Sequence, residues 1–172
     1  LVRSRGLGDV YKRQGWDQAN NTFYFTSNEG SPLRTAVYKI DAKGKKTKLS
    51  TQEGSNSAIF SKNMKYFVNT YSSANIPPVI TLNDNKGKVL TTLVDNQKLK
   101  QQMSGLNMPS KEFFTFKTTD GVELNGWIMK PAHFDTNKKY PVILHQYSGP
   151  GSQQVLDRWG IGAMGNGGLF EA

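Results

Sequence analysis

Tyr147 and the turn that follows it are the residues of this sequence best suited to chemistry. Residues 141–144 form a short apolar run with β-branched side chains, which predicts a buried strand that ends just before Tyr147. In open α/β sheets, active sites form in the loops beyond the carboxyl ends of strands. A tyrosine held there by Gly149, Pro150 and Gly151 can direct its phenol O–H at a developing negative charge. From the residues alone Tyr147 is either an ordinary half-buried tyrosine at a strand end, which is favoured, or an oxyanion-hole donor, and the turn after it is interpreted as structural.

The serines of the sequence do not stand where a hydrolase nucleophile is expected. Ser148 and Ser152 lie near Tyr147, but no serine occurs in a Gly-x-Ser-x-Gly pattern. The sequence has two histidines, His133 and His145, and a catalytic triad needs one of them paired to a serine and an acid. We interpret His133 as structural. His145 either lines the site or packs in the predicted strand, and packing is favoured.

Neither a metal nor a cofactor is expected. Cysteine is absent, and no spacing of His, Asp and Glu matches a metal-ligand pattern. Residues 160–165 match Gly-x-Gly-x-x-Gly, but a dinucleotide site requires a strand before this motif and a helix after it. Because more glycines follow, we interpret the segment as a loop.

The first part of the chain alternates between short apolar runs and turn-forming residues. Such runs at spacings near ten residues predict an all-β sandwich, barrel or propeller. No strict repeat is visible, so spacing alone leaves these architectures open. The expected strands cover residues 22–26, 35–40, 46–49, 57–60, 66–71, 79–82 and 89–93.

The second part of the chain has a different pattern. Residues 95–105 predict one helix, with Asp95 or Asn96 as its cap. An Asp-Gly pair at residues 120–121 lies between two alternating runs and predicts a hairpin. Residues 156–159 begin either a helix or an ordered loop.

Four segments resemble dipeptidyl peptidase IV and its relatives in the prolyl oligopeptidase family of serine peptidases, and they occur in the family's order. Residues 106–111 resemble the segment that leaves the family's β-propeller, and residues 114–131 resemble the first hairpin of its hydrolase domain. Residues 133–141 resemble the next connection, and residues 139–153 resemble the strand and turn that carry the oxyanion tyrosine. The resemblance extends over about residues 16–160.

The resemblance implies a mixed fold and a peptidase activity. Residues 15–108 would be C-terminal blades of a β-propeller, and residues 109–172 would be the first strands of a truncated α/β-hydrolase (peptidase) domain. The parent protein would be a serine exopeptidase that releases N-terminal dipeptides, or tripeptides, after Pro or Ala through an acyl-enzyme. Its Ser-Asp-His triad would lie outside this chain, so the chain alone is expected to be inactive.

Other function classes stay open at this stage. One is a non-catalytic β-propeller scaffold or binding protein, and another is an endo-acting oligopeptidase or acyl-peptide hydrolase of the same family. The parent protein is expected to bind peptide substrates with a penultimate Pro or Ala. A homodimer of the parent protein is one possible assembly. We expect a bacterial periplasmic or secreted protein, with the cytoplasm left open.

Residues 1–14 do not read like the rest of the chain. Residues 4–14 match one frame of a transposon-derived sequencing-library adapter, so we interpret residues 1–14 as an artefact. They hold four basic residues and one acidic residue, and without them the net charge falls from +9 to +6. The lysines of residues 43–48 lie at an expected turn, where solvated lysines protect strand edges.

The sequence predicts neither nucleic-acid binding nor a membrane span in this window. Its basic residues are not interleaved with aromatic ones along a groove, which a nucleic-acid surface requires. It contains no apolar run of about 18 residues.

Overall fold

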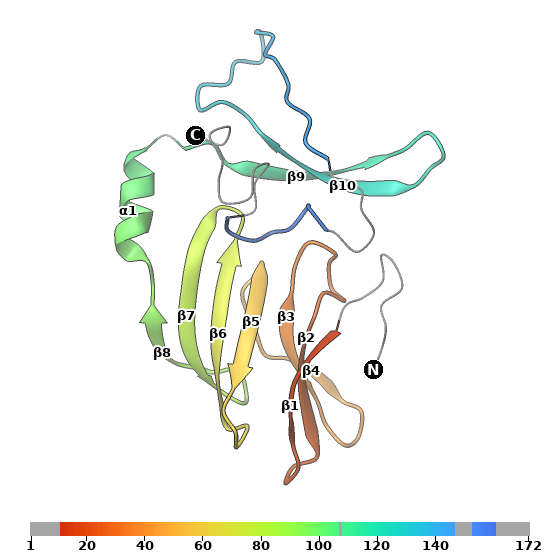
Figure 1. The fold of residues 1–172 in the computed structure, drawn as a ribbon, viewed down its shortest axis with the longest axis vertical. Coiled ribbons are helices and arrows are strands. Elements are labelled where there is room, and N and C mark those ends of the chain that lie inside the picture. Colours follow the sequence, from red (N-terminus) through yellow and green to blue (C-terminus); the bar gives the residue numbers. More distant parts are fainter. Residues whose placement is uncertain (1–10, 107, 147–152, 161–172) are drawn as a thin grey trace.

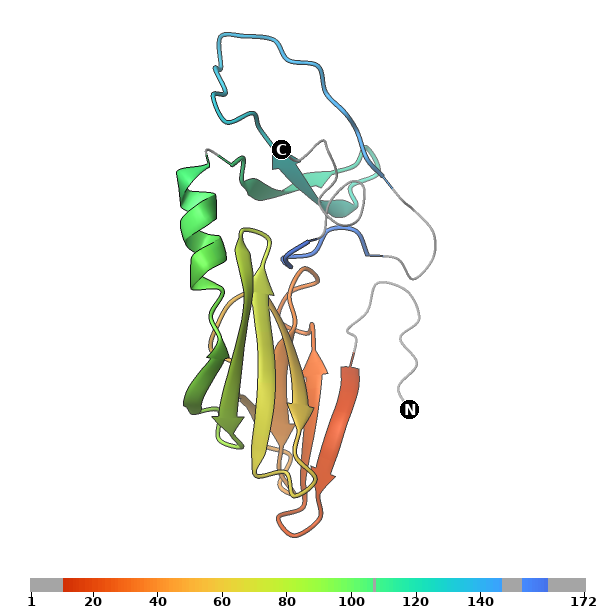
Figure 2. The same cartoon turned by 60° about the vertical axis from the view of Figure 1, so that its left-hand side comes forward.

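The computed structural model describes residues 11–106, 108–146 and 153–160 of the chain. Within them, the chain forms two four-stranded antiparallel sheets, one helix and one two-stranded hairpin (Figure 1). The two sheets stand side by side, and the hairpin lies across their upper ends. Figure 2 shows the helix beyond the outer edge of the second sheet.

The first sheet has the strand order β1-β2-β3-β4. Its strands are β1 (Tyr11–Asp17), β2 (Thr22–Ser27), β3 (Ala36–Ile40) and β4 (Lys46–Lys48). Tyr11 lies opposite Ser27, and residues 11–13 pair with β2 although the sequence pattern placed them outside the fold. An extended segment needs only backbone hydrogen bonds to join a sheet edge, which residues of any origin can supply. The origin of residues 1–14 stays a prediction.

The second sheet repeats this arrangement with the order β5-β6-β7-β8. Its strands are β5 (Ser55–Phe60), β6 (Tyr66–Ser73), β7 (Ile76–Asp84) and β8 (Val89–Val94). A parallel bridge between Thr35 and Ser55 joins the two sheets. The strands expected between residues 22 and 93 are therefore confirmed.

A small apolar core lies between the two sheets. Its buried members come from both sheets and from the connection between them: Tyr24, Val37, Leu49, Ala58 and Phe67. Phe60 covers this core, and its ring lies 4.5 Å from the ring of Tyr24 and 4.8 Å from the ring of Phe67. The alternating burial along β2 follows from a strand with one face on this core.

The same turn closes the last two strands of each sheet. Residues 41–45 read Asp-Ala-Lys-Gly-Lys and residues 84–88 read Asp-Asn-Lys-Gly-Lys. In each turn the Asp Oδ1 accepts two backbone N–H groups at 2.9 Å, and the glycine has a positive φ. This short repeat, which the sequence analysis missed, marks the two sheets as equivalent units.

The helix α1 (Gln97–Gly105) follows β8 and buries none of its residues. Of the two expected caps, Asn96 is the N-cap of the helix but makes no side-chain capping bond, while the preceding Asp95 accepts the N–H of Gln97 at 2.9 Å. Asn96 instead donates its side-chain amide to the Pro78 carbonyl at 2.7 Å and so ties the helix to β7. No helix in the described part of the chain is long and apolar enough to cross a membrane.

The hairpin of β9 (Lys111–Lys117) and β10 (Glu123–Met129) confirms the expected Asp-Gly turn. The prediction of a buried strand at residues 141–144 is wrong. These residues form no strand, and Val142, Ile143 and Leu144 are 71–88 % exposed. A strand is buried only where neighbouring strands and layers cover it. No described residue after β10 supplies such a cover.

Candidate functional site

The residues expected to carry the chemistry are not among those that the structure describes. Tyr147, Gly149, Pro150 and Gly151 lie outside them, and so do both serines beside Tyr147. The oxyanion role of Tyr147 therefore stays a prediction. His145 is exposed, so the interpretation that it packs in a buried strand is wrong.

The segment that follows the expected turn is described, and it lies across the ends of both sheets. Residues 153–160 run between the hairpin and the sheets (dark blue in Figure 1). The Asp157 N–H donates to the Leu33 carbonyl at 2.9 Å, at the first sheet. The Trp159 N–H donates to the Ser72 hydroxyl at 3.3 Å, at the second sheet. The segment thus forms an ordered loop, one of the two expected outcomes, and it joins the two sheets.

Asp157 is the charged residue that anchors this segment. Its side chain is only 9 % exposed, and each carboxylate oxygen has a partner. Oδ2 accepts the Arg34 Nε–H at 2.9 Å, and Oδ1 accepts the Ala74 N–H at 2.9 Å. A buried carboxylate requires such compensation because it has lost its hydration.

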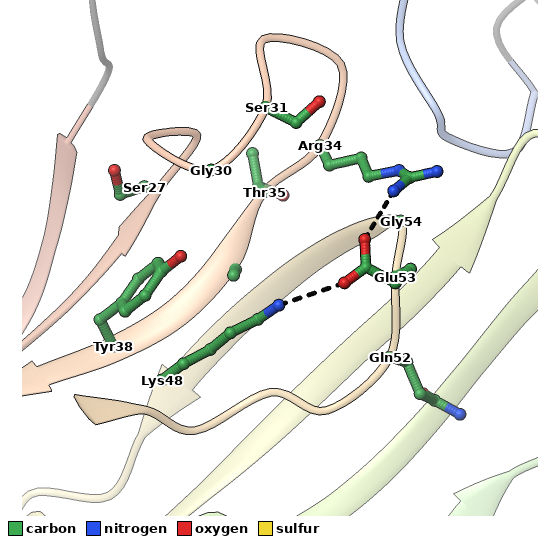
Figure 3. A pocket seen from close by; sticks show the side chains of 11 residues that line it. Ser27, Gly30, Ser31, Arg34, Thr35, Tyr38, Lys48, Gln52, Glu53 and Gly54 are labelled. Carbon is green, nitrogen blue, oxygen red and sulfur yellow. Dashed lines mark hydrogen bonds and ion pairs between the residues drawn. The ribbon is translucent and has the colours of Figure 1, made fainter. Parts of the chain in front are cut away.

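Arg34 connects Asp157 to a second carboxylate and so to a small ionic network. Its Nη1 lies 2.6 Å from Glu53 Oε2, and Lys48 Nζ lies 3.5 Å from Glu53 Oε1 (Figure 3). Desolvation opposes the charged form of Arg34, but the hydrogen bond and charge of Asp157, helped by Glu53, raise its pKa above the usual value. The charges of Lys48 and then Arg34 lower the pKa of Glu53. The raised pKa of Arg34 and the lowered pKa of Glu53 both keep these side chains charged.

The network borders a polar hollow of about 100 Å³ at the end of the first sheet. The hollow contains no acid–base pair suited to acyl transfer, since its two cations face Glu53 and Asp157 and its Ser27 and Ser31 hydroxyls accept turn N–H groups. No group of three His, Asp or Glu residues in the described part of the chain could hold a metal ion. The lining residues are Ser27, Gly30, Ser31, Arg34, Thr35, Ala36, Tyr38, Lys48, Gln52, Glu53 and Gly54.

The turn between β6 and β7 contacts both the anchored segment and the hairpin. Beside Ala74, which binds Asp157, the side-chain amide of Asn75 pairs with the backbone of Lys111. Asn75 Nδ2 donates to the Lys111 carbonyl at 3.0 Å, and the Lys111 N–H donates to Asn75 Oδ1 at 2.9 Å. Lys111 Nζ lies 4.9 Å from the ring centre of Trp127, a cation–π contact within the hairpin. One tight turn therefore holds both later segments against the second sheet.

Sequence reasoning missed Arg34, Asn75 and Asp157. Arg34 and Asp157 are 123 residues apart, and their pairing depends on how two distant turns meet. The signal that was available is an Asp-Arg-Trp triplet, residues 157–159, in an otherwise uncharged stretch. A charged residue within an uncharged stretch that becomes buried almost always pairs with an opposite charge.

Comparisons with known proteins agree with this architecture. The family model described as the dipeptidyl peptidase IV (DPP IV) N-terminal region matches residues 4–78, beginning inside the segment interpreted as an artefact. The crystal structure of Porphyromonas gingivalis dipeptidyl peptidase 4 superimposes with a TM-score of 0.82 at 51 % identity, over 86 % of this chain and 21 % of that one.

Similar curated sequences carry related names. The proteins named "Probable dipeptidyl-aminopeptidase B" from Podospora anserina and Chaetomium globosum are each 38 % identical to this chain over 150 residues. The alignments cover 84 % of this chain and 16 % of each relative.

The chain is DPP IV-like. Its two four-stranded sheets correspond to blades of the β-propeller that forms the DPP IV N-terminal region. The DPP IV-like chain spans about a sixth of the length of the curated relatives it matches. The printed names of these relatives are those of dipeptidyl peptidases and dipeptidyl-aminopeptidases.

Proposed function

We propose that this chain is part of a serine exopeptidase that releases N-terminal dipeptides, or tripeptides, after Pro or Ala. The observation that carries the proposal is the 51 % identity to Porphyromonas gingivalis dipeptidyl peptidase 4, at a TM-score of 0.82. Residues 15–108 supply propeller blades, and residues 109–172 begin the α/β-hydrolase domain. We further propose a periplasmic or secreted location and peptide substrates with a penultimate Pro or Ala.

In the proposed reaction a serine outside this chain attacks the carbonyl carbon that precedes the scissile bond. A histidine takes the serine proton, an aspartate orients the histidine, and the phenol of Tyr147 donates a hydrogen bond to the oxyanion. The propeller restricts entry to short or unfolded peptides.

The role of Tyr147 is tested by Tyr147→Phe in the longer protein that carries this chain. Removal of one oxyanion donor typically lowers kcat by about 10²–10³-fold, and KM should change little because the donor acts in the transition state. Turnover of a Gly-Pro reporter substrate is the measurement.

Tyr140→Phe is the matched control. The Tyr140 hydroxyl accepts the Asp135 N–H at 3.0 Å, and its ring stacks with Phe134 at 5.1 Å, so its role is structural. This variant should keep its kcat while the melting temperature falls. Equal kcat values for Tyr147→Phe and the wild type would remove Tyr147 from the mechanism. A longer protein that leaves dipeptide reporters intact and cleaves internal bonds, or cleaves nothing, would favour the endopeptidase or the scaffold instead.

A further inference from the structure

A cavity between the two blades has a lining without charge. It has a volume of about 190 Å³ and lies between the connection that leaves the first blade and strands β6, β7 and β8 of the second. Leu49 and Phe67 contribute apolar surface, and Asn69, Thr81 and Thr92 contribute carboxamide and hydroxyl groups. Among the described residues that line it, none has a charged side chain. The cavity therefore combines apolar surface with neutral polar groups.

The side chain of Asn56 fixes how the carboxamide of Asn69 is oriented. Asn56 Nδ2 donates to the Thr35 carbonyl at 3.0 Å and to the Gln52 carbonyl at 3.1 Å, so its Oδ1 is the atom that faces Asn69. Asn69 Nδ2 donates to this oxygen at 3.0 Å. If the oxygen and nitrogen of Asn69 were exchanged, two acceptors would face each other. The network therefore determines which end of the Asn69 carboxamide is the nitrogen.

The other end of this carboxamide, Asn69 Oδ1, is an acceptor without a donor. Asn69 is only 7 % exposed, and no group in the described part of the chain donates to its Oδ1. Asn69 lies on β6, between β5 and β7. Because its nitrogen is directed at Asn56 on β5, its oxygen is directed toward β7, where Thr81 pairs with Asn69 and lines the cavity. A buried acceptor without a donor is costly, and native proteins supply a partner.

We propose that this cavity binds a neutral polyhydroxyl molecule no larger than one sugar ring, one hydroxyl of which donates to Asn69 Oδ1. The ligand must carry an O–H or N–H group because the unpaired atom is an acceptor. It must be neutral because a charged ligand would lose its hydration without an opposite charge in the lining. This inference goes beyond the proposed function and does not depend on it.

The size and the mixed lining of the cavity favour a polyol over other neutral donors. Its volume of about 190 Å³ is below the roughly 300–1,000 Å³ of pockets for drug-sized ligands. The C–H groups of a polyol can pack on Leu49 and Phe67 while its hydroxyl groups bind Asn69 and Thr81. A ligand in this position contacts both blades, so its binding should stabilise them against unfolding.

The test is the binding of D-glucose and glycerol to the longer protein that carries this chain. Saturation-transfer NMR detects contact with the protein, and titration calorimetry measures the affinity. We expect saturable binding of D-glucose. D-Glucuronate, which carries a carboxylate on the same ring, should bind at least about 10-fold more weakly. Saturation is the decisive property, because sugars also stabilise proteins through their exclusion from the surface.

Two substitutions in the lining connect the binding to this cavity. Asn69→Val removes the acceptor and should weaken glucose binding by about 10-fold. If this variant does not fold, because it also leaves Asn56 Oδ1 without its donor, Thr92→Val carries the test. Thr92 is exposed, and valine keeps its shape while removing its hydroxyl. This variant should weaken glucose binding by about 3- to 10-fold.

Thr91→Val is the matched control for Thr92→Val. Thr91 pairs with Leu82 and Thr92 with Thr81, and consecutive strand residues face opposite sides of a sheet. The control should therefore bind glucose with wild-type affinity.

Four results would overturn the site. These are no saturable binding of either probe, equal binding of D-glucuronate and D-glucose, wild-type affinity in Thr92→Val, and an equal loss in Thr91→Val. Crystals soaked in glucose that show only water beside Asn69 Oδ1 would also overturn it. Each of these results is independent of peptidase activity, so the proposed function would be unaffected.

Discussion

Gly87 shows how a single absent side chain lets the two blades approach each other. Its φ is +92°, and a Cβ built at this position would lie 2.5 Å from the carbonyl oxygen of Leu49. Leu49 follows β4 of the first blade and is buried in the core, whereas Gly87 lies in the last turn of the second blade. The contact therefore needs glycine for two reasons, the backbone conformation and the space.

Replacement of Gly87 by alanine should cost more stability than the same change at Gly44. Gly44 has a similar φ of +78° in the equivalent turn, but nothing lies within 4 Å of its Cβ position. Gly44→Ala should therefore cost about 1 kcal/mol of backbone strain, and Gly87→Ala about 2–4 kcal/mol because the clash is added. Urea unfolding of the two variants measures the difference. Equal losses of unfolding free energy in the two variants would mean that the Leu49 carbonyl moves away from the new methyl group without cost.

At the scale of elements, one turn design recurs in both blades and, with a different residue, in the hairpin. Asp41 and Asp84 accept backbone N–H groups in the blade turns, and the Thr118 hydroxyl accepts the Val122 N–H at 3.0 Å in the hairpin turn. The turn N–H groups lower the pKa of Asp84, mainly through the bond from Lys88, while its partial desolvation acts in the opposite direction. The hydroxyl of Thr118 accepts the corresponding N–H in the hairpin, and its hydrogen bond to Asp120 also lowers the pKa of that carboxyl.

Asp84→Asn should lower the melting temperature near neutral pH and lose its effect in acid. Because the folded pKa of Asp84 lies below its ordinary value of 3.8, the carboxylate stabilises the fold above that value. This stabilisation disappears as the pH falls through the folded pKa. The melting temperatures of the variant and the wild type should therefore differ at about pH 7 and converge as the pH falls well below 3.8. A pH-independent deficit for Asp84→Asn would contradict the expected role of the charge.

Local signals predicted the blade strands well, because alternation and turn chemistry act over a few residues. They failed at residues 141–144, where burial depends on segments that must cover the run from outside. They failed also at the anchor, because nothing near Arg34 in the sequence specifies that Asp157 will meet it 123 residues later. The recurrence of Asp-x-Lys-Gly-Lys was readable in the sequence, and it would have favoured a repeated blade over a sandwich.

At the scale of the whole molecule, the described part of the DPP IV-like chain combines two blades with one helix and one two-stranded hairpin. Exposed apolar side chains lie along the free edge strands, for example Tyr11 on β1 and Leu93 on β8, which are 46 % and 54 % exposed. Edges of this kind are typical of sheets that pack beside further blades in a propeller.

The 172-residue chain on its own should not cleave a Gly-Pro reporter substrate. The proposed nucleophile and base lie outside it, so an oxyanion donor alone has no attacking group to assist. Release of the reporter dye by the purified chain is the measurement, and the longer protein serves as the positive control. Activity that survives purification and disappears in a Ser148→Ala or Ser152→Ala variant would contradict the assignment of the nucleophile.

The hairpin loop at Ala74 and Asn75 leaves little freedom for variation in length. Asn75 holds the start of β9, and the neighbouring Ala74 holds Asp157, so both later segments take their positions from two consecutive residues. An insertion there would shift one attachment relative to the other. Homologues with a longer loop at this point would need different contacts to hold the hairpin and the segment around Asp157. The length of this loop can be compared directly in related sequences.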